Sequence, residues 1–92
     1  MPTQEEQLVV AGEEAEVLLK NPAFNSVINE LVERAFQTFV NTGPEDAEKR
    51  EYSYSHYRAI VDVVDTLKQR VQVSQSILEQ QNGDNRQEET AP

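Results

Sequence analysis

The sequence predicts an all-α protein: an antiparallel helical hairpin with a long C-terminal helix and a shorter N-terminal third helix. Helix-boundary residues occur at Asn21-Pro22, Thr42-Gly43-Pro44 and Asn82-Gly83. Between these points apolar residues recur three and four positions apart, which is the spacing of one helix face. The two stretches after the first boundary contain no internal Gly or Pro, so nothing interrupts either helix.

Composition narrows the class of partner. Ninety-two residues allow one domain with a small core. The net charge is −9 and the sequence pI is about 4.4, and Lys and Arg are the residues that displace counterions from nucleic acid. The negative net charge therefore disfavours nucleic acid as the main ligand and also disfavours binding to an anionic membrane surface. A basic protein partner stays possible.

Sequence features also bear on location. The chain contains no cysteine, so it needs no oxidising compartment. The N-terminus, residues 1–6, is acidic where a signal peptide would be basic, and no apolar run approaches the length of a membrane span. We expect an intracellular protein without a signal peptide or membrane segment.

The first helix is expected at residues 4–20, with residues 1–3 as its cap. Thr3 and Glu6 have the spacing of a capping box, and acidic residues in the first turn favour the helix dipole. Gly12 lies inside this helix, at a cost of roughly 1 kcal/mol relative to Ala.

The second helix is expected at residues 22–41. Asn21 is a favoured N-cap and Pro22 suits the first helical position. Gly43 can take the left-handed position after the helix, and Pro44 prevents its continuation. The apolar set assigned to the buried face is Phe24, Val27, Ile28, Leu31, Val32, Ala35, Phe36, Phe39 and Val40.

The third helix is expected at residues 45–81 and carries a heptad seam. It would measure roughly 55 Å against roughly 30 Å for the second helix. Residues 82–92 lack apolar side chains except for one Ala, which predicts a disordered acidic tail. The seam consists of Tyr57, Ile60, Val64, Leu67, Val71, Ser74 and Leu78.

This difference in length leaves the second half of the third helix without a cover from the second helix. The first helix could fold back onto it, or another subunit could cover it. Weak patterning in the first helix and the heptad seam favour another subunit, or a mixture of both. On either arrangement, the stripe from Phe24 to Phe39 is expected to pack on Tyr57, Ile60 and Val64.

The sequence contains few candidates for chemistry. His56 is the only histidine, and without a suitably spaced ligand or nucleophile it is expected at the surface or an interface. Asp62 and Asp65 share a helix face with Arg58 and Lys68 nearby, which predicts a solvated salt-bridge face. We therefore predict no catalytic, cofactor-binding or metal-binding residue, and no enzymatic activity.

Tyr52, Tyr54 and Tyr57 lie between Arg50 and Arg58 in one segment. Three interpretations are open: packing against the second helix, a protein interface, or a platform for single-stranded bases. Tyrosine and arginine are both enriched at protein interfaces, and the net charge disfavours nucleic acid.

Boundary signals give the chain a family resemblance. The segments that carry the resemblance are Asn21-Pro22-Ala23-Phe24, Thr42-Gly43-Pro44-Glu45-Asp46, Lys49-Arg50 and the run from Ala59 to Leu67. Residues 18–78, which contain these segments, resemble small helical-hairpin proteins of tailed bacteriophages, which are encoded near head and packaging genes. The resemblance implies a virion or assembly setting, in the host cytoplasm or the virion. It brings no active site with it.

Together these observations predict a non-enzymatic phage structural or assembly factor that forms oligomers and contacts a head, portal or packaging component. One alternative is an acidic inhibitor of a host nucleic-acid-binding protein. Another is a small genome-packaging (terminase-like) subunit. The expected protein-interface residues are Tyr54, Arg58, Val71, Ile77 and Leu78.

Overall fold

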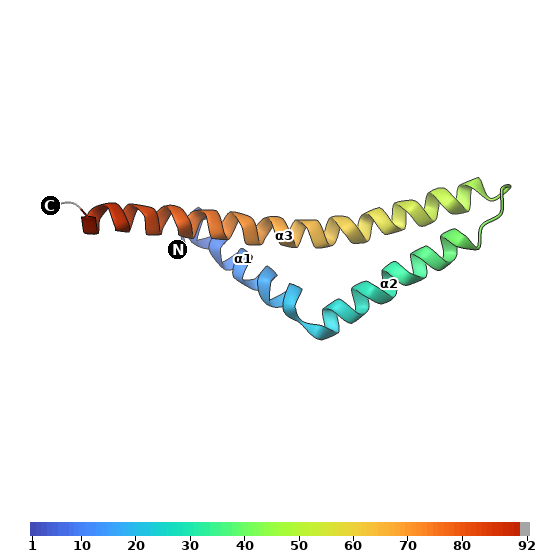
Figure 1. Ribbon diagram of the computed structural model, residues 1–92, viewed down its shortest axis with the longest axis horizontal. Coiled ribbons are helices and arrows are strands. Elements are labelled where there is room, and N and C mark those ends of the chain that lie inside the picture. Colours follow the sequence, from blue (N-terminus) through green and yellow to red (C-terminus); the bar gives the residue numbers. More distant parts are fainter. Residues whose placement is uncertain (91–92) are drawn as a thin grey trace. The chain divides into compact units, whose positions relative to one another are not determined.

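The computed structural model describes residues 1–90, with side chains described for residues 1–83. Within that range the chain is all-helical, as predicted, and contains no strand. Its three helices are α1 (Gln4–Lys20), α2 (Pro22–Val40) and α3 (Ala47–Thr90) (Figure 1).

Both predicted N-terminal caps are present. Thr3 Oγ1 accepts a hydrogen bond from the Glu6 amide at 3.1 Å, which satisfies one free donor at the start of α1. Asn21 has extended backbone angles, and its Oδ1 accepts from the amides of Ala23 and Phe24 at 2.8 and 3.1 Å. Local side-chain chemistry therefore fixes where α1 and α2 begin.

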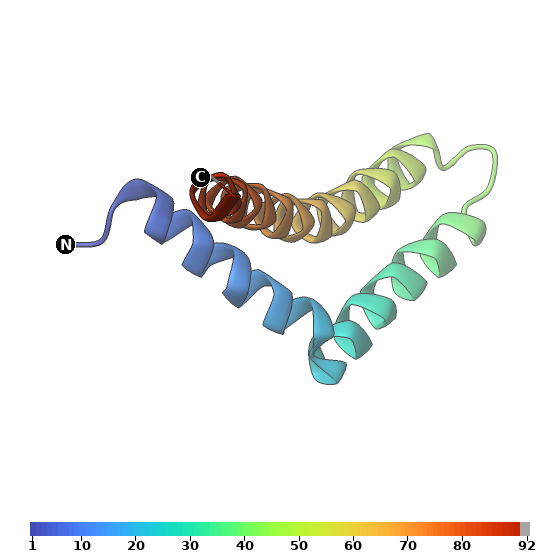
Figure 2. The same cartoon turned by 60° about the vertical axis from the view of Figure 1, so that its left-hand side comes forward.

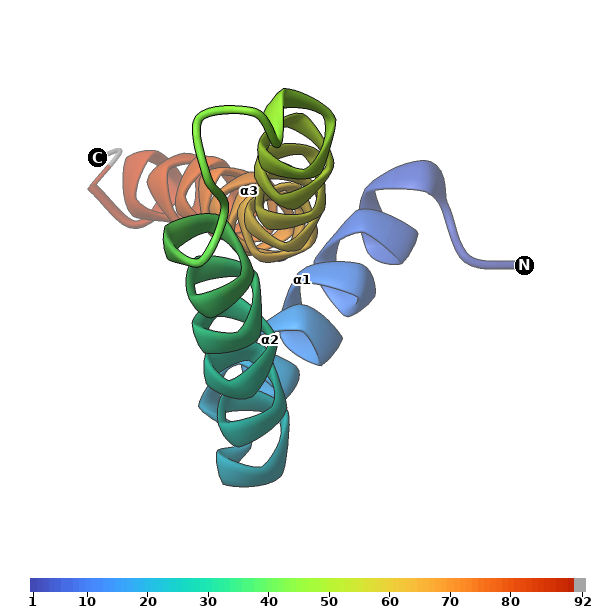
Figure 3. The same ribbon diagram turned by 90° about the vertical axis from the view of Figure 1, so that its right-hand side faces the viewer.

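The turn between α2 and α3 closes differently from the prediction. Gly43 does not adopt a positive φ, so the left-handed cap expected there is wrong. The Asp46 carboxylate instead accepts from the Gly43 amide at 3.0 Å, and the Gly43 carbonyl accepts from the Asp46 amide at 3.0 Å. The Arg50 guanidinium also donates to the carbonyls of Gly43 and Pro44. Figure 3 shows the loop that these groups hold.

α3 begins two residues later than predicted and continues past Asn82-Gly83 to Thr90. Gly83 does not leave the right-handed region, and a glycine inside a helix costs only about 1 kcal/mol. The pair therefore does not stop the helix where the sequence predicted. Of the tail expected at residues 82–92, positions 91–92 lie outside the described residues.

The chain forms two compact units. The terminal unit comprises Met1–Leu18 and α3 from Leu67 onward, and the central unit comprises Leu19–Thr66. Each unit contains one part of α3 and one shorter helix, and each is described by itself below.

In the terminal unit α1 packs on α3 of the same chain (Figure 2). Gly12 is buried, and a Cβ built on it would lie 2.1 Å from Ser74 Cβ. Ser74 Oγ donates to the Val9 carbonyl at 3.4 Å. At Ser74 this part of α3 is therefore covered by α1 of the same chain, which excludes cover by another subunit alone and leaves the mixture of both open. The absence of a Cβ at Gly12 is what permits the approach of α1, and periodicity alone did not reveal it.

In the central unit Ala35 of α2 and Ile60 of α3 are buried. The predicted stripe on α2 is covered only in part. Ala35 is buried and Leu31 is half-buried, but Phe39 and Tyr57 are exposed. The expected packing of the stripe on Tyr57, Ile60 and Val64 is therefore closed at Ala35 and Ile60 and open at Phe39 and Tyr57.

The heptad seam of α3 agrees with the burial pattern except at its two end residues, Tyr57 and Leu78, which are exposed. Ile60 is buried, and Val64, Leu67 and Val71 are half-buried. The most buried α3 positions are two serines, Ser53 and Ser74, which lie three heptads apart. Small side chains therefore mark the positions on α3 that neighbouring helices approach most closely.

Candidate protein-interaction site

Most of the buried residues are small. Among the side chains of residues 1–83, no large one is fully buried. A protein interior normally buries its large apolar side chains first, since they gain most from leaving water. Here the buried residues are Gly12, Ala15, Ala35, Ser53, Ile60 and Ser74.

Large apolar side chains gather instead in a groove of the central unit. We call this surface the aromatic groove; it has a volume of about 440 Å³. Its lining also includes Glu33 at one edge and the buried Ser53. The side chains that define the aromatic groove are Val32, Phe36, Phe39, Tyr54 and Tyr57.

Helical spacing explains why these side chains meet. Val32, Phe36 and Phe39 are four and three residues apart, so they form one row along α2. Tyr54 and Tyr57 are three residues apart on α3 and form the facing row. The accessible fractions are 56% for Phe36, 46% for Phe39, 61% for Tyr54 and 41% for Tyr57.

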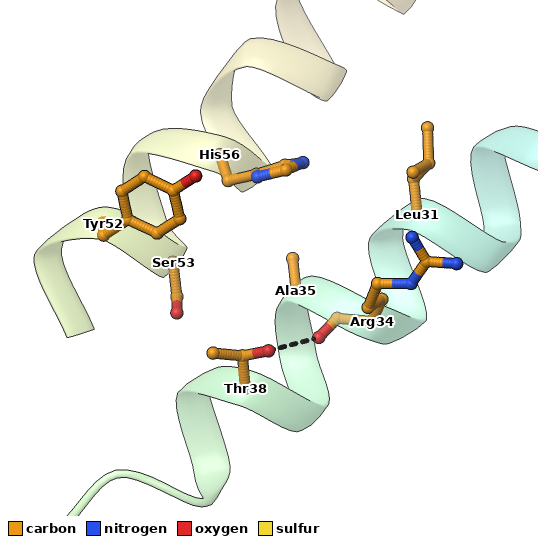
Figure 4. Close-up of a pocket in the computed structure, with 7 residues that line it drawn as sticks. All are labelled: Leu31, Arg34, Ala35, Thr38, Tyr52, Ser53 and His56. Carbon is orange, nitrogen blue, oxygen red and sulfur yellow. Dashed lines mark hydrogen bonds between the residues drawn. The ribbon is translucent and has the colours of Figure 1, made fainter. Parts of the chain in front are cut away.

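A smaller cavity of about 200 Å³ also lies between α2 and α3 (Figure 4). Ser53 points from α3 toward α2, and its hydroxyl has no hydrogen-bond partner among the described residues. Thr38 Oγ1 donates to the Arg34 carbonyl at 3.0 Å. The Arg34 guanidinium pairs with Glu30 at 3.1 Å, so its charge is already compensated.

His56 lines this smaller cavity and is exposed, as expected. Its ring meets the Tyr52 ring edge to face, with centroids 6.2 Å apart and an interplanar angle of 73°. Such aromatic pairs contribute about 0.5–1.5 kcal/mol. This geometry gives His56 a packing partner within its own helix.

The tyrosines predicted as a cluster are all exposed, so none of them is buried against α2, although each lines a hollow together with α2 residues. Tyr54 lies in the aromatic groove. Arg58 pairs with Asp62 at 3.4 Å, which confirms the predicted salt-bridge face at that position. Arg50 is held by the turn carbonyls, which removes one guanidinium from the predicted base-stacking platform.

Val71, Ile77 and Leu78 belong to the terminal unit and not to the aromatic groove. Val71 and Ile77 are half-buried, and 39% of Leu78 remains accessible. Their expected role in association stays a prediction.

The aromatic groove includes three residues that the sequence assigned to a buried face: Val32, Phe36 and Phe39. The width of the apolar face of α2 could have predicted that some of these residues stay exposed. Nine apolar residues on a helix of 19 residues exceed what one neighbouring helix covers, because an apolar stripe for a single contact is narrower.

Other classes of site find no support in the described part of the chain. No cluster of three or more His, Asp or Glu side chains there could hold a metal ion. None of the described helices is both long enough and apolar enough to cross a membrane. In comparisons with known proteins, no family model, no curated protein and no solved structure matches this chain.

Proposed function

We propose that this protein acts without catalysis, as a structural or assembly factor whose function is protein–protein contact. The contact element is the pair α2 and α3, arranged as an antiparallel helical hairpin. The aromatic groove is the main contact surface, and Tyr54 and Arg58 are among its anchoring residues.

Exposure of the aromatic groove is the observation that supports this function. Taking 150–250 Å² for each aromatic side chain, its four rings leave on the order of 400 Å² accessible. A contiguous apolar patch of a few hundred Å² usually has a binding role, because soluble monomers rarely expose more. Tyr and Phe are also enriched in the buried centres of interfaces.

The resemblance to small helical-hairpin proteins of tailed phages supplies the setting. It implies a protein of the virion or of its assembly, located in the host cytoplasm or the virion. The partners in that setting are further copies of the chain and a head, portal or packaging component. Val71, Ile77 and Leu78 form a second, smaller contact region in the terminal unit.

The alternatives have weaker support. An acidic inhibitor needs its carboxylates in rows on one open face. The sequence instead spreads its 17 acidic residues over all segments, with the densest cluster at Glu5, Glu6, Glu13, Glu14 and Glu16. A genome-packaging subunit needs aligned basic side chains, and the charge of Arg58 is already compensated by Asp62.

Cross-linking of the full-length chain in lysate from its native host tests the contact function. Phe36→Glu places a charge in the aromatic groove at a side chain that is already exposed, so the fold should survive. Val17→Glu makes the same chemical change on α1, where Val17 is also exposed. We expect the wild type and Val17→Glu to cross-link to the same proteins, and Phe36→Glu to lose at least tenfold in yield.

Circular dichroism of the three proteins checks that helicity is retained. If Phe36→Glu is folded and cross-links as strongly as the wild type, the aromatic groove is not the contact surface and the proposed function fails.

A further inference from the structure

The edge of the aromatic groove carries charges of both signs. Glu33 lines the groove itself, and Arg50 and Glu51 line an adjoining hollow together with Phe39 and Tyr54. An apolar centre bordered by two acids and by Arg50 carries charges of both signs, which a surface that binds its own copy requires.

We propose that the aromatic groove binds a second copy of this chain, groove to groove about a two-fold axis. This inference rests on the proposed contact function and names its partner. In a two-fold contact the same patch serves on both copies, so each residue pair occurs twice. Acidic and basic rim residues of one copy then face those of the other, and charge pairs form in both directions.

The distribution of charge favours this surface over the rest of the chain for self-association. Residues 19–66 contain eight acidic and five basic residues, a net charge of −3. The remaining segments contain nine acidic and three basic residues, a net charge of −6. Repulsion between two copies is therefore weakest where the central units meet, whereas a basic partner protein would be attracted to the terminal unit.

The accessible area also fits a pair of copies. With about 400 Å² of exposed ring surface on each copy, the aromatic side chains of two copies together would bury about 800 Å². The rim residues then bring the contact toward the roughly 1,200 Å² at which specific interfaces begin. Such an interface is at the small end of the range, so association should depend visibly on concentration.

Light scattering on the purified full-length chain over a range of concentrations tests this inference. We expect the wild-type mass to rise toward twice the 10.5 kDa of one chain. Phe36→Glu should stay at the mass of one chain with its helical spectrum intact. The matched control Val17→Glu should reach the doubled mass.

Energy transfer between copies gives a second readout. Because the chain has no cysteine, Ser55→Cys creates a single labelling site in the hollow that Phe39 and Tyr54 line. Donor-labelled and acceptor-labelled chains should show transfer that increases with concentration. The transfer should disappear when Phe36→Glu is introduced into the labelled chain.

The inference is overturned if the wild type remains at the mass of one chain, or if it assembles beyond two copies. It is also overturned if Phe36→Glu keeps the doubled mass or Val17→Glu loses it. If the wild type is a single chain in solution but Phe36→Glu still abolishes cross-linking in lysate, the contact function stands and the occupant of the groove is a different protein. If Phe36→Glu changes neither mass nor cross-linking, both proposals fail.

Discussion

At Gly12 the absence of a side chain permits the contact between α1 and α3. A Cβ there would lie 2.1 Å from Ser74 Cβ and 2.7 Å from the Arg70 carbonyl oxygen. Both distances are far below ordinary contact, and the carbonyl belongs to the backbone of α3, which cannot rotate away. The cost of glycine in a helix, about 1 kcal/mol, is thus offset by the packing that glycine permits.

Gly12→Ala should therefore destabilise the protein, although alanine is the better helix former. Overpacking a tight contact costs typically 1–3 kcal/mol, so we expect a net loss of about 1–2 kcal/mol in thermal unfolding followed by circular dichroism. Gly83→Ala is the matched control, because a Cβ there meets nothing within 4 Å. It should stabilise by up to about 1 kcal/mol. Equal stabilisation by both changes would show that α1 does not pack at Gly12.

Ser53 and Ser74 are both buried serines of α3 with different hydrogen bonding. Ser74 donates to the Val9 carbonyl, whereas the Ser53 hydroxyl has no partner among the described residues. A buried polar group without a partner costs about 1–3 kcal/mol. Their small size, which allows the neighbouring helix to approach, is retained in alanine.

Ser53→Ala should raise the free energy of unfolding by up to about 1 kcal/mol, because it removes the unpaired hydroxyl. Ser74→Ala should lower it by about 0.5–1.5 kcal/mol through loss of its hydrogen bond. Urea unfolding of both variants measures the difference. A destabilised Ser53→Ala protein would mean that the hydroxyl has a partner in solution.

At the scale of the element, the bounds of α1 and α2 follow closely from the sequence, whereas the end of α3 does not. Asn21 and Thr3 identify their helices because each cap is a bond between a side chain and the next turn. Gly43 and Gly83 misled the prediction, since neither adopts a positive φ. Glycine permits that conformation but does not require it, and the long-range partner Arg50 decides the geometry of the turn.

Arg50 should stabilise the central unit through the α2–α3 turn. Hydrogen bonds from a charged donor contribute about 1.5–3 kcal/mol, and Arg50 is half-buried. We expect Arg50→Ala to lower the free energy of unfolding by about 1–2 kcal/mol. The exposed neighbour Lys49 gives the control, Lys49→Ala, which should change it by less than about 0.5 kcal/mol. Equal effects would indicate that the carbonyls of the turn do not depend on Arg50.

Apolar patterning predicted the helical faces but not which residues on them are covered. The nine apolar positions of α2 were correctly placed on one side by their spacing. How many of these residues are covered depends on how closely α3 approaches α2. Ala35 and Ser53 are the small buried residues of the two helices. Phe36 and Phe39 then lie beside the contact and not within it. Tyr54 was predicted as an interface residue because it lies among arginines; it lines the aromatic groove, and its contact role stays a prediction.

At the scale of the whole molecule, a 92-residue chain with a core of small residues has little apolar burial to oppose chain entropy. Its largest apolar side chains, the rings of the aromatic groove, remain in water. Association through that groove would bury them and add stability by mass action. Folding stability and assembly are then linked, so the melting temperature should rise with protein concentration.

Hydroxyl-radical labelling read by mass spectrometry tests the central claim most directly, because it reports the exposure of individual rings in the assembled and the dilute protein. We predict that Phe36, Phe39 and Tyr54 are labelled in dilute protein and protected several-fold on assembly. Tyr52 lies outside the aromatic groove with 70% of its surface accessible, and its labelling should not change. Unchanged labelling of Phe36, Phe39 and Tyr54 in a protein that has assembled would contradict the claim.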